Sequence, residues 1–287
     1  MSQDWSRRKI LGTAAGLGTA LAAGPLRAQS GNGLLERLRK AGSVKIGIAN
    51  APPYSSLKPD GTVDGVAPSI VKVVMERLGV PKLEVSTAPY GQMIPGLQAG
   101  RWDIIGASMS VSKARCELVR FADPFTIDHN AVAYIPSVLP DPPRSIAETP
   151  IKNVTIGVTA GSYVQAFLEA VQTKPGMITV FPDGPSLIEG LMAKRVQTAF
   201  TGILALRTLR ELKSNAFDIY YPILDDGLHA SSSAFRLTDT DLYDAFQVEF
   251  RKMRKSGEAA EIVGRFGFDM KPEYLEVDAD RACAEAT

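Results

Sequence analysis

Hydrophobic and polar residues along the chain follow two spacings that alternate in a regular order. Short apolar or alternating runs predict strands, and apolar residues three or four positions apart predict helices. On this basis we expect strands over 43–49, 83–86 and 102–107, and helices over 68–79 and 93–98. Strands that alternate with helices in this way are typical of a parallel sheet covered by helices.

The same order begins again after a proline-rich segment at 139–143. The expected strands are 131–135, 154–158, 177–181 and 196–200, and the expected helices are 163–171 and 186–193. Amphipathic helices follow over 242–253 and 259–266, and residues 278–287 are expected to form a frayed tail. Two similar α/β units joined by short segments predict two lobes with a cleft between them. Ligands of such proteins bind outside the carboxyl ends of the strands.

The N-terminal segment has the composition of an export signal. Arg7 and Arg8 precede a short apolar stretch rich in glycine and alanine, and Ala28 has the small side chain of a cleavage site. The stretch is shorter than the ~18 residues of a spanning helix, and its weak hydrophobicity favours the twin-arginine route. Residues 1–28 are therefore predicted to direct the protein to the periplasm. Leu26 stands where a small residue is expected, which leaves the cleavage position open, and an ordinary amphipathic helix is the alternative.

Charge and cysteine content exclude several classes of protein. The 287 residues include 32 basic and 31 acidic ones, and removal of the signal leaves 28 basic and 30 acidic residues. A nucleic-acid-binding protein would carry a basic excess, so no nucleic-acid partner is expected. Two cysteines are too few for a disulfide framework or a four-thiolate zinc site. No other apolar run approaches the length of a membrane span, so we expect a soluble protein rather than the sensor domain of a receptor.

Motifs along nearly all of the mature chain resemble one known family. They are Ile46-Gly47-Ile48, Asp60 to Gly65, Ile94 to Asp103, Ser108 to Phe125, Gly157 to Ser162, and Lys255 to Gly267. In this order they are similar to the family 3 extracellular solute-binding proteins, which deliver polar amino acids and related solutes to ABC importers. Within that family, Ile94-Pro95-Gly96-Leu97 and Arg115-Cys116 most resemble the branch that binds ectoine and hydroxyectoine.

The resemblance implies the type II periplasmic binding protein fold, an α/β fold of two lobes, each a sheet flanked by helices. The chain would cross between the lobes twice, near residues 125–134 and 220–229. Lobe 1 would comprise residues 29–127 and 225–287, and lobe 2 would comprise residues 128–224. Such a protein is expected to be a monomer without a cofactor. It would close its lobes on a small carboxylated solute and then dock on the ABC permease subunits in the inner membrane.

Arg115 is the strongest candidate for binding the ligand, because a guanidinium presents parallel donors to a carboxylate and keeps its charge. In the family, the matching arginine holds the ligand carboxylate; the alternative is an ordinary surface arginine. Ser108 and Ser110 precede it at the expected end of a strand, where hydroxyl groups add donors. Gly161 and Ser162 come before an expected helix, and their backbone N–H groups could reach the same anion from the other lobe.

Three tyrosines, Tyr54, Tyr90 and Tyr163, fall at ligand positions of the family. An aromatic face can cover the apolar or cationic part of a solute, and for a cation the contact contributes about 0.5–2 kcal/mol. For each tyrosine, packing with an exposed hydroxyl is the alternative interpretation.

Acidic residues are missing where the family usually has them. Gly202 stands where α-amino-acid binders have the acid that pairs with the ligand ammonium. Ala51 and Ser110 stand where ectoine binders have an acid and an aromatic residue. The sequence thus predicts a carboxylate clamp without an evident counter-charge for an amine, unless Asp226 or the adjacent Asp225 supplies one. We therefore expect a small carboxylated solute that need not be a standard α-amino acid.

The histidines and cysteines leave further possibilities. His129 and His229 lie near the expected crossings, but without nearby cysteine or carboxylate ligands they make a poor metal site, so no metal is expected. Cys116 and Cys283 could pair in an oxidising periplasm. Because Cys283 lies in the expected tail, the pairing stays open.

A periplasmic dehydratase acting on prephenate- or arogenate-like acids is the alternative function, since a few relatives of this fold have that activity. Such chemistry requires a positioned acid or base, for which Glu189, Asp226 and the two histidines are the candidates. No Ser-His-Asp order, phosphate-binding loop or HExxH run supports catalysis. The sequence therefore favours a binding protein over an enzyme.

Overall fold

The computed structural model describes residues 33–170, 176–224 and 229–286. These residues belong to one compact unit, residues 32–287. The predicted export signal and the candidate counter-charge Asp226 lie outside the described residues. Within those ranges, no helix has both the length and the apolar content that a membrane crossing requires.

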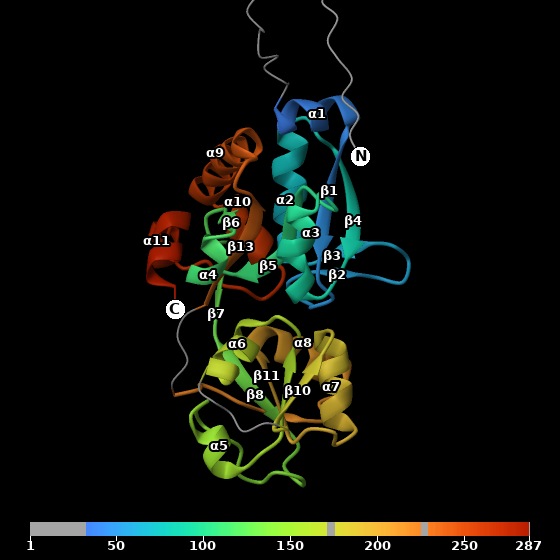
Figure 1. The fold of residues 1–287 in the computed structure, drawn as a ribbon, viewed down its shortest axis with the longest axis vertical. Coiled ribbons are helices and arrows are strands. Elements are labelled where there is room, and N and C mark those ends of the chain that lie inside the picture. Colours follow the sequence, from blue (N-terminus) through green and yellow to red (C-terminus); the bar gives the residue numbers. More distant parts are fainter. Residues whose placement is uncertain (1–32, 171–175, 225–228, 287) are drawn as a thin grey trace, which may run out of the picture. The chain divides into compact units, whose positions relative to one another are not determined.

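The first sheet has six strands in the order β4-β1-β5-β13-β6, with β7 also paired to β13 (Figure 1). As predicted, β1 (Ser43–Ile48) is parallel to β4 (Lys82–Thr87) and β5 (Ile104–Ser110). Antiparallel to β5 runs β13 (His229–Arg236), which also pairs with β6 (Val119–Phe121) and β7 (Thr126–Asp128). The alternation of apolar residues that predicts β1 reflects the burial of one face of the strand, since Val44, Ile46 and Ile48 are fully buried.

Helices pack against this sheet in two hydrophobic cores. The larger core contains α1 (Leu34–Ala41), α2 (Val66–Arg77), α9 (Thr240–Ser256) and α10 (Glu258–Gly264). The smaller core contains α3 (Met93–Gln98), which follows the short 3-10 helix η1 (Tyr90–Gln92). A short hairpin of β2 (Ser56–Leu57) and β3 (Val63–Asp64) lies between β1 and α2 in the sequence.

The second sheet has five strands in the order β10-β9-β11-β8-β12. They are β8 (Asn130–Tyr134), β9 (Ile156–Thr159), β10 (Ile178–Phe181), β11 (Thr198–Gly202) and β12 (Asp218–Tyr220). Its helices are α5 (Glu148–Lys152), α6 (Tyr163–Ala170), α7 (Gly184–Met192) and α8 (Ile203–Leu212). Figure 1 shows these elements together below the first sheet. Buried apolar residues of α7 and α8 pack against the sheet, so this part of the chain has a core of its own.

The chain passes between the sheets at the two segments predicted to cross. Strand β7 ends in the first sheet at Asp128, and β8 begins in the second sheet at Asn130. The return runs from β12, which ends at Tyr220, to β13, which begins at His229. The predicted fold class, an α/β protein with two helix-flanked sheets and two crossings, is confirmed.

The structure differs from the sequence predictions in a few elements. Helix α8 and the short helix α4 (Lys113–Cys116) were not predicted. The prediction of a frayed C-terminal tail is wrong, because α11 (Ala279–Glu285) is a helix whose Ala279 and Ala282 are buried. Long-range contacts hold this helix in place. Cys283 forms a disulfide with Cys116 of α4, 167 positions earlier, which answers the question of pairing that the sequence left open.

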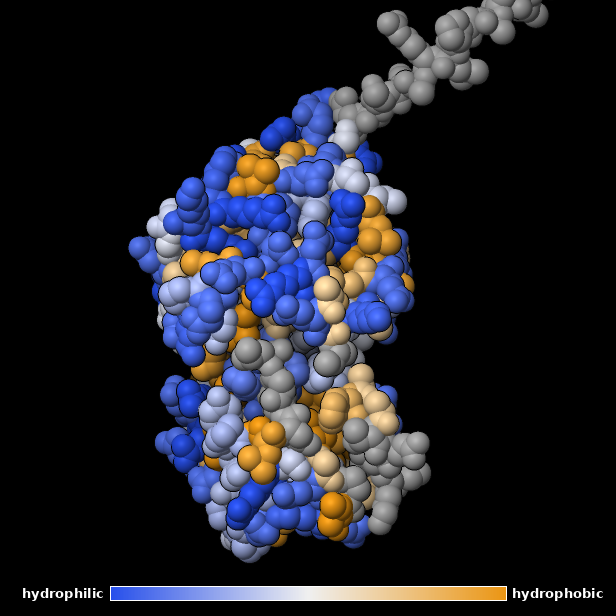
Figure 2. All heavy atoms as spheres, turned by 90° about the vertical axis from the view of Figure 1, so that its left-hand side faces the viewer, coloured by the Kyte–Doolittle hydropathy of each residue, from blue (hydrophilic) through white to orange (hydrophobic). Residues whose placement is uncertain are grey.

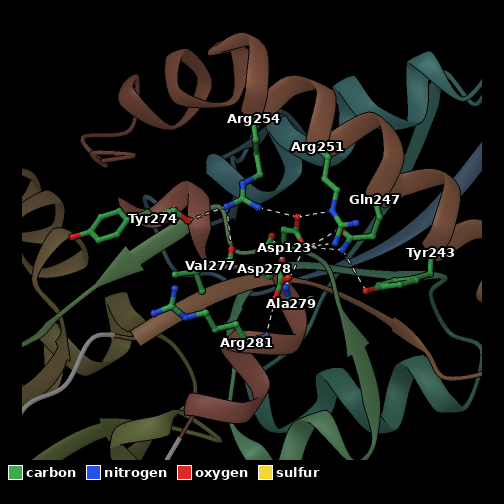
Figure 3. A network of polar contacts seen from close by, with 11 residues as sticks. Asp123, Tyr243, Gln247, Arg251, Arg254, Tyr274, Val277, Asp278, Ala279 and Arg281 are labelled. Carbon is green, nitrogen blue, oxygen red and sulfur yellow. Dashed lines mark hydrogen bonds and ion pairs between the residues drawn. The ribbon is translucent and has the colours of Figure 1, made fainter. Parts of the chain in front are cut away.

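A buried ionic network ties the same C-terminal segment to the first sheet (Figure 3). At its centre is Asp123, 1% exposed, whose carboxylate accepts hydrogen bonds from Arg251, Arg254, Gln247 and the backbone N–H of Ala279. Arg254 also donates to the carbonyl oxygens of Tyr274 and Val277. The network and the disulfide thus fix the end of the chain at separate points.

The face drawn in Figure 2 is mostly hydrophilic, with hydrophobic residues in small separate groups. Such a surface is ordinary for a protein exposed to water. A cavity lined by Arg115 and several hydroxyl-bearing side chains lies elsewhere in the described residues.

Candidate functional site

A cavity of about 90 Å³ lies where the elements of both sheets meet. One buried water requires about 10–15 Å³ on this measure, so a small solute fits. Seven of the predicted site residues line the cavity: Tyr54, Tyr90, Ser108, Ser110, Arg115, Ser162 and Tyr163. The structure therefore brings together residues that lie up to 109 positions apart in the sequence. Of the other two predicted residues, Gly161 lies beside the cavity and Asp226 is outside the described residues.

Arg115 is positioned by the short helix α4. The Ser112 side chain caps this helix by accepting the Arg115 backbone N–H. The guanidinium donates through Nη1 to the Ser110 carbonyl at 2.8 Å and through Nη2 to the Gly161 carbonyl at 2.7 Å. Burial lowers the pKa of Arg115, although an arginine remains charged. Among the described residues no carboxylate pairs with it, so its charge is available to an anion in the cavity.

Ser108 presents to the cavity a hydroxyl group that has no partner among the described residues. Its side chain is 4% exposed, and within the described residues its hydroxyl has no hydrogen-bond partner. Its backbone has φ +48°, a left-handed conformation that costs a non-glycine residue roughly 1–2 kcal/mol. Buried hydroxyls are almost always paired, so a ligand atom is the expected partner.

Tyr90 lines the cavity close to Arg115. Its hydroxyl donates to the Ala107 carbonyl at 2.8 Å, which fixes the ring orientation. Burial raises the pKa of Tyr90, and the nearby Arg115 charge only partly opposes this shift. Tyr90 therefore stays neutral and contributes an aromatic wall.

Asp128 is a cavity residue that the sequence analysis missed. The Tyr54 hydroxyl donates to Asp128 Oδ2, and the His129 backbone N–H donates to Oδ1 at 2.8 Å. Burial is the main cause that raises the pKa values of Asp128 and Tyr54. Asp128 is thus an acidic cavity residue besides the predicted Asp226, and the prediction of a clamp without an evident counter-charge did not consider it. Asp128 lies in the first expected crossing, 125–134, where the reasoning that pointed to Asp226 in the second crossing could have found it.

The backbone N–H groups of Gly161 and Ser162 have hydrogen-bond partners within the protein. The Gly161 N–H donates to Gln165 Oε1 at 2.8 Å, and the Ser162 N–H donates to the Thr159 carbonyl at 3.0 Å. Both groups predicted to bind an anion are thus engaged within their own segment. The Gly161 carbonyl instead accepts the Arg115 guanidinium.

Several contacts connect the elements of the two sheets around the cavity. Besides the bond from Arg115 to Gly161, Asn50 Nδ2 donates to Asp183 Oδ2 at 3.0 Å. Gly161 also lies against Gly91, since an ideal Cβ on Gly161 would be 2.3 Å from the Gly91 nitrogen. Elements of the two sheets thus meet beside the cavity through the Arg115–Gly161 hydrogen bond, the Asn50–Asp183 hydrogen bond and the close approach of Gly91 to Gly161.

His129, His229 and Tyr163 also line the cavity. The Tyr163 ring lies 4.3 Å from the His229 ring, measured between centroids. Across the described ranges, no group of three or more His, Cys, Asp and Glu side chains is placed to hold a metal ion. The aromatic rings thus form part of the cavity wall.

Two open sheets flanked by helices, joined by two crossings beside a cavity that elements of both sheets line, define the fold of a solute-binding protein of the periplasmic type. Residues 44–269 match the bacterial extracellular solute-binding proteins, family 3. The chain therefore belongs to this family, which confirms the resemblance found in the sequence.

Individual relatives agree with this assignment. The probable amino-acid ABC transporter periplasmic-binding protein y4tE of Sinorhizobium fredii is 25% identical over 261 residues, which cover 88% of this chain and 85% of the relative. The crystal structure of EhuB in complex with hydroxyectoine has a TM-score of 0.83 and 31% identity, covering 88% of this chain and 98% of EhuB. An ancestral amino-acid-binding protein, AncCDT-1, described as a precursor of cyclohexadienyl dehydratase, has a TM-score of 0.71. At 19% identity over 81% of this chain and 98% of that chain, it shows the shared fold alone.

Proposed function

We propose that the protein is the periplasmic substrate-binding component of an ABC importer and captures a small carboxylated solute by lobe closure. Suitable solutes are polar amino acids or amino-acid derivatives, with ectoine-like compatible solutes first. The likeness to EhuB, whose structure contains hydroxyectoine, supports this choice. In this proposal, the twin-arginine signal in residues 1–28 directs export. The mature protein is a monomer and docks on the permease subunits of the inner membrane.

The observation that carries the proposal is the positive charge of Arg115 at the cavity, which no carboxylate among the described residues neutralises. A half-buried guanidinium whose hydrogen bonds within the described residues go to carbonyl oxygens is poorly compensated, and a ligand carboxylate would complete its coordination. The orphan hydroxyl of Ser108 faces the same cavity and could donate to that carboxylate. The bond from Arg115 to Gly161 joins elements of both sheets, so ligand binding and closure would use the same side chain.

The division into lobes forms part of the proposal. We assign residues 29–127 and 225–287 to lobe 1 and residues 128–224 to lobe 2. The pairing of β8 to β12 in one sheet, with β1 to β7 and β13 outside it, supports these limits.

The screen that tests the proposal is a thermal-shift assay with amino acids, ectoines, betaines and dicarboxylates. A ligand at ~100 times its Kd stabilises the folded protein by ~2.7 kcal/mol. We expect at least one carboxylated solute to raise the melting temperature and Arg115→Ala to abolish that rise. Lys113→Ala is the matched control, since Lys113 is an exposed cation on the same helix. Full affinity in Arg115→Ala would contradict the site assignment.

A dehydratase is the second candidate, because Asp128 offers a cavity carboxyl whose pKa is raised by burial, as a general acid requires. It has less support, because the likeness to the dehydratase precursor is one of fold alone. Turnover of prephenate or arogenate by the purified protein would favour it over the binding function.

A further inference from the structure

The short helix that carries Arg115 has little packing of its own. Helix α4 spans Lys113–Cys116, and all of its residues are at least partly exposed. Helices owe most of their stability to a buried face, and a single turn is marginal without one. The Ser112 cap and the backbone hydrogen bonds of this turn are local contacts. A contact from elsewhere in the chain is therefore needed to hold α4 in one place.

The disulfide between Cys116 and Cys283 supplies that contact. Cys116 is the last residue of α4 and the neighbour of Arg115, and its partner Cys283 belongs to α11. Figure 1 shows α4 beside α11, and both cysteines pack against the smaller core of the first sheet. Because Arg115 and Cys116 are adjacent in the chain, a displacement of Cys116 must displace Arg115 as well.

Helix α11 is itself attached to the first sheet by the ionic network (Figure 3). The Ala279 N–H donates to the buried carboxylate of Asp123 at 3.1 Å, and Arg254 donates to the Val277 carbonyl at 3.0 Å. These bonds fix the start of α11, and the disulfide leaves from its other half. A continuous series of contacts thus runs from Asp123 through α11 and the disulfide to Arg115.

We propose that the Cys116–Cys283 disulfide positions Arg115 for the ligand carboxylate, so that the protein binds its solute with full affinity only when the two cysteines are joined. The inference rests on the proposed function and adds a positioning role for two residues that do not line the cavity. When the bond is broken, α4 keeps only its local contacts. The guanidinium then loses the fixed backbone from which it reaches the carbonyls of Ser110 and Gly161.

The bond is accessible to redox chemistry from the surface. A groove of about 570 Å³ beside it is lined by both cysteines, which are half-buried. Bond formation removes two protons and two electrons from the two thiols, and a disulfide-bonded oxidant accepts them and becomes a dithiol. Disulfides form in the oxidising periplasm and are rare in the cytosol. Under the proposed function, full affinity therefore arises only after export.

The test compares affinities with and without the bond. Titration calorimetry with hydroxyectoine, glutamate, glycine betaine and succinate is carried out on the oxidised wild type, the wild type reduced with dithiothreitol, and the double variant Cys116→Ser/Cys283→Ser. Dithiothreitol converts the bond into two cysteine thiols by two thiol–disulfide exchanges and becomes a cyclic disulfide itself. All titrations are made at a temperature where circular dichroism shows every sample to be folded, so that a loss of global stability does not by itself change the Kd.

The oxidised variant Met75→Ala is the matched control. Met75 is fully buried in the larger core, whereas the two cysteines pack on the smaller one. Its removal costs stability on the scale of a lost disulfide and leaves the cross-link intact.

We expect the reduced wild type and the double variant to bind the best probe about 5- to 30-fold more weakly than the oxidised wild type, because fixing the backbone of a single residue changes an equilibrium constant by roughly this factor. Met75→Ala should bind it as the wild type does. Wild-type affinity without the bond, or an equal loss in Met75→Ala, would overturn the inference and leave the proposed function standing. If no probe binds any sample, both are overturned.

Hydrogen exchange of the ligand-free protein gives a second measurement, which does not depend on the solute. The backbone N–H groups of Arg115 and Cys116 donate to the Ser112 carbonyl at 3.0 and 2.9 Å. If the cross-link holds α4, reduction should accelerate the exchange of these two groups, while the amides of β1 keep their rates. Unchanged exchange in α4 would overturn the inference whether or not a solute binds.

Discussion

Replacement of Gly161 by alanine tests whether the two sheets must approach each other for the ligand to bind. Gly161 has φ +69°, and its ideal Cβ would lie 2.3 Å from the nitrogen and 2.4 Å from the Cα of Gly91. Both are backbone atoms and cannot rotate away from the new methyl group. Because Gly91 precedes α3 and Gly161 precedes α6, the methyl group would hold elements of the two sheets apart.

The expected loss of affinity follows from the hydrogen bond between Arg115 and Gly161 that this separation breaks. Ordinary contact with a Cβ begins at 3.4 Å, so the two loops must separate by about 1 Å. The 2.7 Å bond from Arg115 Nη2 to the Gly161 carbonyl would then exceed the usual upper limit of about 3.2 Å. A hydrogen bond with a charged donor contributes about 1.5–3 kcal/mol, so the Kd should rise about 10- to 100-fold. The left-handed backbone costs alanine about 1 kcal/mol in open and closed forms alike, which lowers stability without changing affinity.

Gly42→Ala is the matched control. Gly42 has φ +70°, and nothing lies within 4 Å of its ideal Cβ. Denaturant unfolding of the ligand-free variants should show similar losses of stability. Titration calorimetry with the solute identified by the thermal-shift screen should show weaker binding for Gly161→Ala alone. Wild-type affinity in Gly161→Ala would refute the reasoning.

Three further variants test other parts of the structure. Cys283→Ser should lower the free energy of unfolding by about 2–5 kcal/mol in denaturant titrations under oxidising conditions, and reducing agent should remove the difference from the wild type. Asp123→Ala should cost about 3–5 kcal/mol, because Arg254 is then buried without its anion; an effect near zero would show that the network is not stabilising. Gly202→Ala should weaken ligand binding, measured by calorimetry, because its methyl group would collide with the Tyr54 hydroxyl. Unchanged affinity would show that the part of the cavity beside Gly202 and Tyr54 does not contact the ligand.

The same network gives an expected pH dependence. Burial acts to raise the pKa of Asp123, but the hydrogen bonds of Arg251 and Gln247 and the charge of Arg254 outweigh it, and the net pKa is lowered. A carboxyl with a lowered folded-state pKa stabilises the protein above its unfolded value of about 3.9. That stability is lost as the pH falls through the folded-state pKa. Acid unfolding should therefore depend less on pH in Asp123→Asn than in the wild type, and parallel curves would contradict this assignment.

Elements with strong local patterns could be predicted from the sequence. Strand β1 and helix α9 have apolar residues at the spacing of their buried faces, so tertiary packing and local preference agree. Helix α11 could not be predicted in this way, because its buried face consists of small alanines. Its order depends on Cys116 and Asp123, which lie more than 150 positions away and leave no trace in the local pattern.

The candidate site likewise contains residues that could be predicted from the sequence and residues that could not. Arg115 was predicted because its guanidinium matches a carboxylate and stands at the ligand position of the family motif, and it lines the cavity. Asp128 was missed because an aspartate at a chain crossing is also an ordinary turn residue, and its partner Tyr54 is 74 positions away. For Gly161, the sequence shows that an N–H group precedes a helix but does not show that this group donates to the Gln165 side chain.

The attachment of the C-terminus has a consequence for biosynthesis. Ribosomes release a chain from its N-terminus, so Arg115 emerges long before Arg254, Ala279 and Cys283. Until those residues arrive, Asp123 lacks its cations and the short helix of Arg115 lacks its cross-link. A chain that stops early would therefore carry every predicted ligand residue and still hold its arginine loosely.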